Sequence, residues 1–382
     1  MTPSLRAFAA GVWRAGRRAA RGIAGVGAAA TRSRPVELGR CRSVGVFFPH
    51  RLGDFVLAVP TLQALADAAA TARLVLVVRP ALSGIAHLAG SRWNVVATRE
   101  GLAAREAARY LSQAAGPLDG FIDLTVDEHL EGARIARAGQ YPMTAGFTTA
   151  GRGAGFGTRL GSARTPEQLW RVLGRAADHL APGRDCRPPS LPVDAAARAG
   201  AAADLNRRCA APADGRPLLG LAPGATYPSQ QWPAEAFAAA GAALGARGKV
   251  FVFGSPAERE LVQEIARRAG ATPVWDLPLG RLPAALASVN LLVANNSGPL
   301  HLAAAVGTPT VSVMGPTDPV RFWPLGPRNR VLRLGLPCSP CGRGRCAPHP
   351  CLRGIPVEAV LEAVAETLVG IAGRELGEVV HG

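Results

Sequence analysis

Strand-like and helix-like stretches alternate along most of the chain, and this alternation constrains the fold more than any other feature of the sequence. In the N-terminal half, apolar runs at 44–48, 74–78 and 120–124 are typical of buried strands. The helix-like segment 61–70 follows the first of these runs. Because a strand, a helix and a second strand in this order form a unit with parallel strands, this half is predicted to be an α/β domain.

A second alternating series occupies the C-terminal half. In chain order it comprises strand 218–222, helix 234–246, strand 249–253, helix 257–269, strand 291–294, helix 299–306 and strand 310–314. Between the two series, prolines and glycine interrupt the pattern at 181–192, as expected of a linker. The chain is therefore predicted to form two doubly wound domains with parallel sheets. Their strand-to-helix loops should face a central cleft, because ligands of such sheets bind beyond the carboxyl ends of the strands.

The predicted organisation adds an arm and a tail to these domains. It consists of an N-terminal arm 1–42, a first domain 43–180, a linker 181–192, a second domain 193–355, and a C-terminal helix and tail 356–382. Residues 356–372 have an amphipathic helical pattern, and we expect this helix to pack back across the domains.

Positive charge is concentrated in the arm. The chain carries 43 Lys+Arg and 27 Asp+Glu, a net charge of +16, and the first 43 residues hold nine Arg and one Glu, which is half of the excess. A helix over 5–23 would place Leu5, Phe8 and Val12 opposite a row of arginines. This pattern is typical of helices that lie on anionic membranes. A loose basic arm or a transit-like extension is the alternative.

Composition and hydropathy argue against several classes of protein. With 48% hydrophobic residues, the chain is too apolar for general disorder. No apolar run reaches the roughly 18 residues that a membrane-spanning helix needs, and arginines interrupt any secretory signal. We expect a cytoplasmic protein, and the basic arm suits peripheral contact with an anionic membrane surface. Few aromatic residues lie among the arginines and no recognition motif occurs, so nucleic acid is not an expected partner.

A carboxylate follows the first predicted strand. The turn Arg51-Leu52-Gly53-Asp54 leads from this strand toward the next helix. Gly53 permits an unusual backbone conformation there, and the amides that begin the helix can orient a ligand. Asp54 is either an N-cap of this helix or a catalytic group.

Three loops of the second domain suit an anion. They are Pro223-Gly224-Ala225-Thr226 with Ser229 and Gln230, then Asn296-Ser297-Gly298 with His301, and Gly315–Pro319 with Arg321. In the second loop, Ser297 can cap the following helix, and its amides and dipole favour negative charge. Ordinary turns and a structural histidine are the alternatives for all three loops.

Four of the seven cysteines are clustered near the end of the second domain. Cys338, Cys341, Cys346 and Cys351 are candidate ligands for zinc or an iron–sulfur cluster. Their irregular spacing and the arginines between them disfavour a metal. Reduced structural cysteines or a disulfide-stabilised loop near the domain junction are the alternatives.

Taken together, these loops resemble those of glycosyltransferase family 9, the ADP-heptose:lipopolysaccharide heptosyltransferases. The resemblance covers about 43–370. It depends on Arg51–Asp54 with Pro60–Leu65, Pro223–Ala225 with Trp232-Pro233, Asn296–Ala304, and Gly307–Thr310 continuing into Gly315–Pro319. The cysteine cluster also resembles a segment of many members.

The resemblance implies a GT-B fold with two Rossmann-like domains. The first domain would bind mainly the acceptor, and the second would bind the nucleotide-sugar. The resemblance also implies inversion at the sugar in a single displacement, with Asp54 as the general base and no metal for that step. Thr226, His301 and the amides around Ser297 and Gly298 match phosphate-contacting positions, and Glu258 matches an acidic residue near the ribose.

Three positions depart from the family pattern. Gln230 stands where a phosphate-binding lysine is usual, and Arg321 is a candidate replacement for its charge. Asn296 stands where the family has an aspartate, which lowers the local negative charge. The segment from Asp123 to Glu128 lacks the usual Asp-x-Gln-Gly and borders the acceptor side, so a different acceptor is one interpretation.

The sequence predicts an inverting glycosyltransferase that moves heptose, or a related sugar, from an ADP-sugar to the inner core of a lipid-linked lipopolysaccharide precursor. The donor-site residues are Thr226, Ser229, Gln230, Glu258, Asn296, Ser297, Gly298, His301 and Arg321, and the acceptor-side residues are Arg51, Gly53 and Asp123. The alternatives are a relative with another nucleotide-sugar and glycan acceptor, and a non-catalytic sugar-nucleotide-binding protein. The oligomeric state stays open.

Overall fold

The computed structural model describes residues 37–209 and 214–378, so the helix expected at 5–23 lies outside the described residues. The chain divides into two compact units. Of the described residues, the first unit contains those up to Arg51 and Ala58–Arg187, and the second contains Leu52–Leu57 and those from Pro188 onward. The first turn of one helix thus groups with the second unit.

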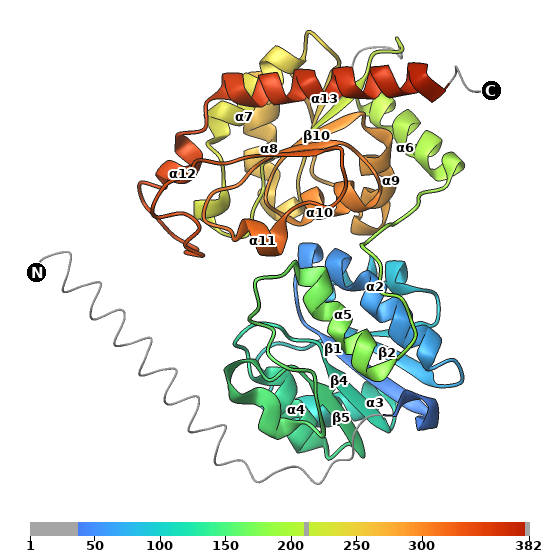
Figure 1. Cartoon of the computed structure of the whole chain (residues 1–382). Helices are drawn as coiled ribbons and strands as arrows, with labels where there is room; N and C mark the ends of the chain where they lie inside the picture. The colour runs from blue at the N-terminus through green and yellow to red at the C-terminus, as the bar shows by residue number, and fades with distance from the viewer. Residues whose placement is uncertain (1–36, 210–213, 379–382) are drawn as a thin grey trace, which may run out of the picture. The chain divides into compact units, whose positions relative to one another are not determined.

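The first unit is built on a parallel six-stranded sheet in the order β3-β2-β1-β4-β5-β6. Its strands are β1 (Ser43–Phe48), β2 (Arg73–Val78), β3 (Trp93–Ala97), β4 (Gly120–Asp123), β5 (Met143–Gly146) and β6 (Thr158–Arg159). Its helices are α2 (Leu52–Ala68), α3 (Ala104–Ala115), α4 (Glu131–Gly139) and α5 (Leu169–Leu180), which Figure 1 shows beside the sheet.

The second unit repeats this plan with the strand order β12-β11-β10-β7-β8-β9, again all parallel. Its strands are β7 (Leu218–Ala222), β8 (Lys249–Phe253), β9 (Thr272–Val274), β10 (Leu291–Asn295), β11 (Thr310–Val313) and β12 (Asn329–Leu332). Its helices are α6 (Ala195–Arg208), α7 (Ala234–Leu244), α8 (Arg259–Ala269), α9 (Leu282–Ser288), α10 (Gly298–Ala305), α11 (Pro319–Phe322), α12 (Pro350–Arg353) and α13 (Val357–Glu378).

The long α13 crosses the second unit (Figure 1) and packs against α7, β10, β11 and β12 of that unit. Its apolar residues Val360 and Val364 are fully buried in the core that the sheet shares with α7 and α8. The helix expected at 356–372 is therefore present, and these packing contacts belong to the second unit.

The predicted α/β architecture is confirmed, because both sheets are parallel and both are accompanied by helices. Every residue of β1, β7, β8 and β10 is buried, which explains why these strands are continuous apolar runs in the sequence. The edge strands β3 and β12 are partly exposed and were not predicted.

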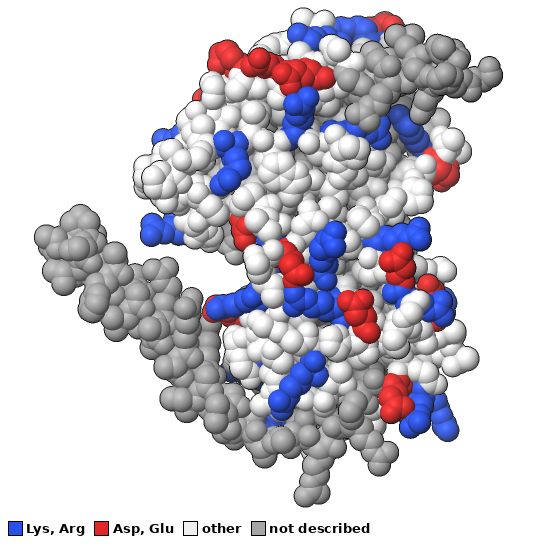
Figure 2. Space-filling model, viewed as in Figure 1, with Lys and Arg blue, Asp and Glu red and all other residues white. Residues whose placement is uncertain are grey.

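None of the helices in the described part of the chain is long and apolar enough to span a membrane. On the face shown in Figure 2, arginine and lysine side chains are interspersed with acidic ones over both units. Neither unit therefore presents a surface of one charge sign in this view.

Candidate functional site

The loops at the carboxyl ends of β7 and β10 are joined through Asn295, the last residue of β10. Its Oδ1 accepts a hydrogen bond from the Trp232 amide at 2.9 Å, and its Nδ2 donates to the Pro223 carbonyl at 2.6 Å. Asn295 is fully buried, so these two bonds hold the loop after β7 and the segment before α7 beside the end of β10. Asn295 was not among the predicted site residues.

The N-terminus of α10 presents two buried polar atoms without a partner. Ser297 occupies the N-cap position with an extended backbone, but its side chain makes no capping hydrogen bond. Its Oγ and the Nδ1 of His301, one turn into the helix, are both buried and have no hydrogen-bond partner among the described residues. The expectation that the Ser297 side chain caps α10 is therefore wrong. A buried polar group left unpaired costs about 1–3 kcal/mol, which a ligand at this helix end would relieve.

His301 is held as a neutral base. Burial lowers the pKa of His301 to about 4, and the negative charge of Asp54 opposes this shift only in part. Its ring lies 6.4 Å from that of Phe322, measured between centroids. At neutral pH the imidazole is uncharged, so it meets a ligand as a hydrogen-bonding group.

Asp54 is the third residue of α2, which begins at Leu52. The N-cap interpretation of Asp54 is therefore wrong, because the residue lies within the first turn. The preceding Gly53 is in close contact with α10: a Cβ on Gly53 would lie 3.0 Å from Cδ2 of His301 and 3.5 Å from Cα of Gly298. The first turn of α2 and the start of α10 therefore bring Asp54 and His301 into one neighbourhood. Arg51 is exposed just before α2.

Glu258 lies against the loop after β7. A Cβ on Gly224 would be 2.0 Å from Oε1 of Glu258, so only glycine leaves room for this carboxylate. The other oxygen, Oε2, accepts hydrogen bonds from the amide and the hydroxyl of Ser255, both at 2.8 Å. Thr226, in the same loop as Gly224, is exposed. The structure thus brings Glu258 and the loop that contains Thr226 together.

The two amides that replace the usual charged residues are both hydrogen-bonded. Nε2 of Gln230 donates to the hydroxyl of Thr317 at 3.2 Å, and Nδ2 of Asn296 donates to the Phe322 carbonyl at 3.0 Å. An aspartate in place of Asn296 has no proton to donate to that carbonyl. Both amides thus fix the segment after β11, which includes Arg321 on α11.

Ser229 connects this region to the cysteine-rich segment. Its buried hydroxyl donates to the Arg343 carbonyl at 2.5 Å, so the structure gives it a supporting position. The amides of Cys341 and Gly342 donate to the Pro316 carbonyl at 3.1 and 2.8 Å, and Ser339 Oγ donates to Gly315 at 2.7 Å. The segment that carries the cysteines therefore supports the loop after β11.

All four clustered cysteines are unbridged. Cys338 and Cys341 are exposed, Cys346 is half-buried and Cys351 is buried. Within the described ranges, 37–209 and 214–378, no three His, Cys, Asp or Glu side chains are arranged to hold a metal ion. The disulfide alternative is therefore wrong for these cysteines, and a metal at this segment stays a prediction.

Asp123 lies at the end of β4 in the first unit, with a side chain that is completely buried. Its Oδ1 accepts from the Thr125 amide at 2.9 Å, and its Oδ2 lies 3.5 Å from Nη1 of Arg152, an ion pair too long to count as a hydrogen bond. Burial raises the pKa of Asp123 to about 6, against the opposing effect of Arg152. Asp123 therefore fixes the loop that follows β4 and pairs with the buried Arg152.

Comparison with known proteins gives a consistent family. Residues 119–351 match the model of glycosyltransferase family 9 (heptosyltransferase). Lipooligosaccharide heptosyltransferase 2 of Campylobacter jejuni is 31% identical over 166 residues, which are 41% of this chain and 52% of that protein. Lipopolysaccharide heptosyltransferase 2 of Escherichia coli K12 is 30% identical over 165 residues, 40% of this chain and 47% of that protein. The chain thus spans about half the length of the curated relatives it matches.

Solved structures of the family share the fold. The structure of E. coli ADP-heptose lps heptosyltransferase II superposes with a TM-score of 0.68 at 21% identity, covering 86% of this chain and 99% of that one. The family 9 glycosyl transferase from Veillonella parvula gives a TM-score of 0.70 at 22% identity, covering 89% and 100%. The predicted GT-B fold is confirmed.

Proposed function

The chain belongs to glycosyltransferase family 9, and we propose from this that it transfers heptose or a closely related sugar. The proposed donor is an ADP-activated sugar, and the proposed acceptor is the inner core of a lipopolysaccharide precursor. The observation that carries the proposal is the pair of unpartnered buried atoms at the start of α10, Ser297 Oγ and His301 Nδ1. They lie where the helix dipole favours an anion.

The donor diphosphate is proposed to bind at this helix end. Ser297, His301 and the backbone amides near Gly298 would then supply hydrogen bonds to the phosphate oxygens, and Thr226 lies in a neighbouring loop. Glu258 is proposed to accept hydrogen bonds from the ribose hydroxyls, because its carboxylate lies over Gly224 in that loop. Gln230 contributes a neutral amide where a lysine is usual, and Arg321 is the cation proposed to replace that charge.

The proposed reaction is a single displacement at C1 of the sugar. The acceptor hydroxyl oxygen forms the new bond to C1, its proton passes to the Asp54 carboxylate, and the bond between C1 and the phosphate oxygen breaks. The electron pair of that bond leaves with ADP. Donors already oriented at the start of α10 stabilise the charge that develops on the departing phosphate, which is how preorganised dipoles lower such a barrier. The mechanism inverts the configuration at C1 and assigns no step to a metal.

The acceptor is proposed to approach the Asp54 turn, with Arg51 and Gly53 beside it and Asp123 fixing the neighbouring loops. The names of the relatives, lipooligosaccharide and lipopolysaccharide heptosyltransferases, support a lipid-linked glycan as the acceptor. A protein acting on such an acceptor would work at the cytoplasmic face of the inner membrane. The basic arm, with nine Arg and one Glu in the first 43 residues, is suited to that surface.

Calorimetry with ADP, GDP and UDP tests the donor class. We expect ADP to bind and the other two to bind at least about tenfold more weakly, since discrimination depends on contacts to the base. Preferred binding of GDP or UDP would instead select a family member with another nucleotide-sugar.

A pair of serine variants tests the observation that carries the proposal. Ser297→Ala should lower ADP affinity about five- to tenfold and leave stability unchanged or higher, because its hydroxyl has no partner in the free protein. Ser288→Ala is the matched control, because the Ser288 hydroxyl donates to the Ala285 carbonyl at 2.8 Å. This variant should lose stability and keep ADP affinity. Unchanged ADP affinity in Ser297→Ala would exclude its hydroxyl from the donor site.

The second candidate is a sugar-nucleotide-binding protein without transferase activity. The observation in its favour is that Gln230 is bonded to Thr317, so the neutral amide already has a structural partner. ADP binding without transfer of any tested sugar would support this candidate.

A further inference from the structure

A separate cavity lies in the first unit, between α3, α4 and the loops that lead into β4 and β5. Its volume is about 650 Å³, within the range of small-molecule sites. It is lined by residues that precede β4 and β5, such as Leu118 and Pro142, so it lies at the amino ends of these strands. Asp123 lies at the carboxyl end of β4. The cavity is therefore distinct from the proposed transfer site.

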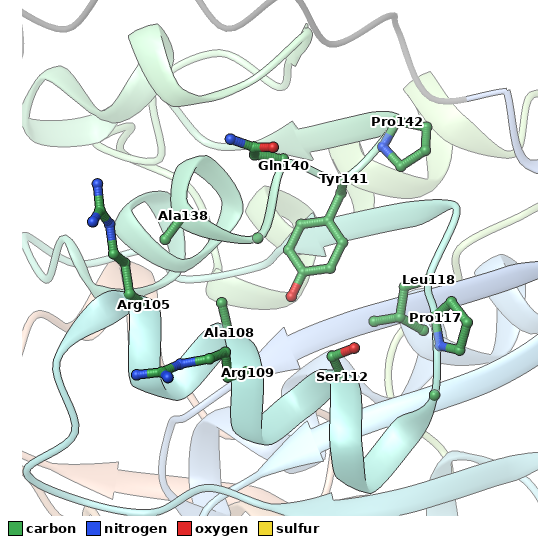
Figure 3. Close-up of a pocket in the computed structure, with 12 residues that line it drawn as sticks. Arg105, Ala108, Arg109, Ser112, Pro117, Leu118, Ala138, Gln140, Tyr141 and Pro142 are labelled. Carbon is green, nitrogen blue, oxygen red and sulfur yellow. The ribbon is translucent and has the colours of Figure 1, made fainter.

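Two arginines give this cavity a positive side. Arg105 and Arg109 lie one turn apart on α3, and Ser112 follows on the same side of the helix. Figure 3 shows both guanidinium groups on one side of the cavity, and Pro117, Leu118 and Pro142 on the other. No acidic residue is among the residues that line it. The cavity thus has a cationic side and an apolar side.

Tyr141 supplies a neutral hydrogen-bond donor that has no partner. The Tyr141 side chain is 8% exposed, and its buried hydroxyl makes no hydrogen bond within the part of the chain that the structure describes. The ring stacks on Phe121 at 4.7 Å between centroids, and a Cβ on Gly139 would lie 2.5 Å from it, so the ring is fixed in place. Figure 3 shows the hydroxyl directed toward α3. Burial raises the pKa of Tyr141 to about 12, so the hydroxyl keeps its proton at neutral pH.

The C-terminal end of α3 is covered by a cation, which matters because free helix carbonyls repel anions. The Arg73 guanidinium covers this end, donating to the Ala115 carbonyl and to the Pro117 carbonyl at 2.6 Å. The nearby Glu106 is turned back to the start of α3, where its carboxylate accepts from the Ala103 amide at 2.9 Å. Neither the carbonyls nor Glu106 therefore cancels the positive charge of Arg105 and Arg109.

We propose that this cavity binds a phosphate group carried on a small, partly apolar body. The phosphate lies between the Arg105 and Arg109 guanidinium groups, and the body contacts Leu118 and receives a hydrogen bond from Tyr141. Paired arginines suit phosphate because each presents several N–H donors in a planar fork. Two sources carry this chemistry, namely a glycerophospholipid headgroup and a soluble sugar or glycerol phosphate.

The test compares two double variants of the full chain that remove the same charge. Arg105→Ala/Arg109→Ala removes the cavity pair, and Arg134→Ala/Arg137→Ala removes an equally exposed pair on the neighbouring α4 that does not line the cavity. Binding of glycerol 3-phosphate is measured by calorimetry, with ADP in excess to fill the proposed donor site. Binding of phosphatidylglycerol vesicles is measured by cosedimentation, with phosphatidylcholine vesicles as the neutral reference.

We expect Arg105→Ala/Arg109→Ala to weaken binding of either glycerol 3-phosphate or phosphatidylglycerol vesicles by about tenfold or more, because charged hydrogen bonds are lost. The affinities of the control variant should stay near those of the wild type. A loss with glycerol 3-phosphate identifies a soluble ligand, and a loss with vesicles alone identifies a lipid headgroup. Tyr141→Phe should weaken the same binding severalfold without lowering stability, because it removes an unpaired hydroxyl. Equal effects of both arginine pairs in both arms, or no saturable binding in either, would overturn the proposal.

Discussion

The chemistry of the proposed donor site depends on single buried groups whose charge is set by their surroundings. Burial holds His301 neutral although Asp54 is nearby, and it leaves Ser297 and His301 with unused hydrogen-bonding capacity. Both features suit a site that is completed by an anion. They also make the free protein sensitive to pH.

The His301→Gln variant tests that sensitivity. Burial lowers the pKa of His301 from 6.5 to about 4, so between these values the unfolded chain takes up a proton that the folded protein does not. The stability present above pH 6.5 is therefore lost as the pH falls, by about 2 kcal/mol near pH 5. Urea unfolding should show that the free energy of unfolding of the wild type falls between about pH 7.5 and about pH 5. In His301→Gln this fall should be smaller by about 2 kcal/mol. Parallel pH profiles would show that His301 titrates normally.

Asp123 provides a stability test in the first unit. Asp123→Ala leaves the buried Arg152 guanidinium without its partner, and we expect a loss of about 3–5 kcal/mol in the free energy of unfolding. Asp185→Ala breaks the Arg187–Asp185 pair, whose side chains are 83% and 73% exposed. That control should change stability by less than about 0.5 kcal/mol. Similar losses in the two variants would contradict the assignment of Asp123 as a buried structural carboxylate.

The places of the proposed site residues along the chain were predictable, because these residues follow predicted strands. Asp54 lies in the first turn of the helix that follows β1, and Ser297 and His301 lie at the N-cap and in the first turn of the helix that follows β10. Their detailed contacts were not predictable. Asp54 lies inside α2 because the helix begins at Leu52, and Asn295 joins two loops through contacts that are distant in sequence.

At the scale of elements, the strands that were predicted are those with continuous apolar runs, and the mostly buried β5, Met-Thr-Ala-Gly, was missed because it is not such a run. Central strands such as β1 and β10 are buried throughout and are continuous apolar runs, whereas β3 and β12 lie at sheet edges and carry exposed residues. The helix α3 was missed although its spacing is amphipathic. Its arginines could not be assigned to a cavity from sequence, because the cavity is formed only when α3 packs against α4.

The approach of the β7 loop to Glu258 gives an element-level prediction. In Gly224→Ala, the new Cβ must displace the Glu258 carboxylate, which is the movable end of a flexible side chain. We expect ADP affinity to fall several-fold and stability to fall by less than about 2 kcal/mol, since the loss is confined to the Glu258 hydrogen bonds. Gly335→Ala is the control, because a Cβ at Gly335 has no atom within 4 Å. Calorimetry that finds the two variants alike would remove Glu258 from the nucleotide site.

At the scale of the molecule, the fold is confirmed, whereas contact with a membrane stays a prediction. The repeated alternation of strands and helices predicts both sheets, and the structure has both. The charge of the arm lies mainly outside the described residues, so its function stays a prediction.

Removal of residues 1–36 tests the arm. This segment contains seven arginines and no acidic residue. Because each basic residue near an anionic surface contributes about 1 kcal/mol, the shortened protein should bind phosphatidylglycerol vesicles at least about tenfold more weakly. Binding to phosphatidylcholine vesicles should change little, and high salt should remove the difference. Equal cosedimentation of both proteins with anionic vesicles would show that the charge of the arm is incidental.

Turnover by Asp54→Ala tests the central claim most directly. The assay follows transfer of heptose from ADP-heptose to a lipid-linked inner-core acceptor that lacks heptose, with ADP binding measured in parallel to show that the variant is folded. The account predicts transfer by wild type and a loss of about 100-fold or more in Asp54→Ala, as expected when a general base is removed, with ADP affinity retained. Transfer at the wild-type rate by Asp54→Ala would contradict the assignment of Asp54 as the base.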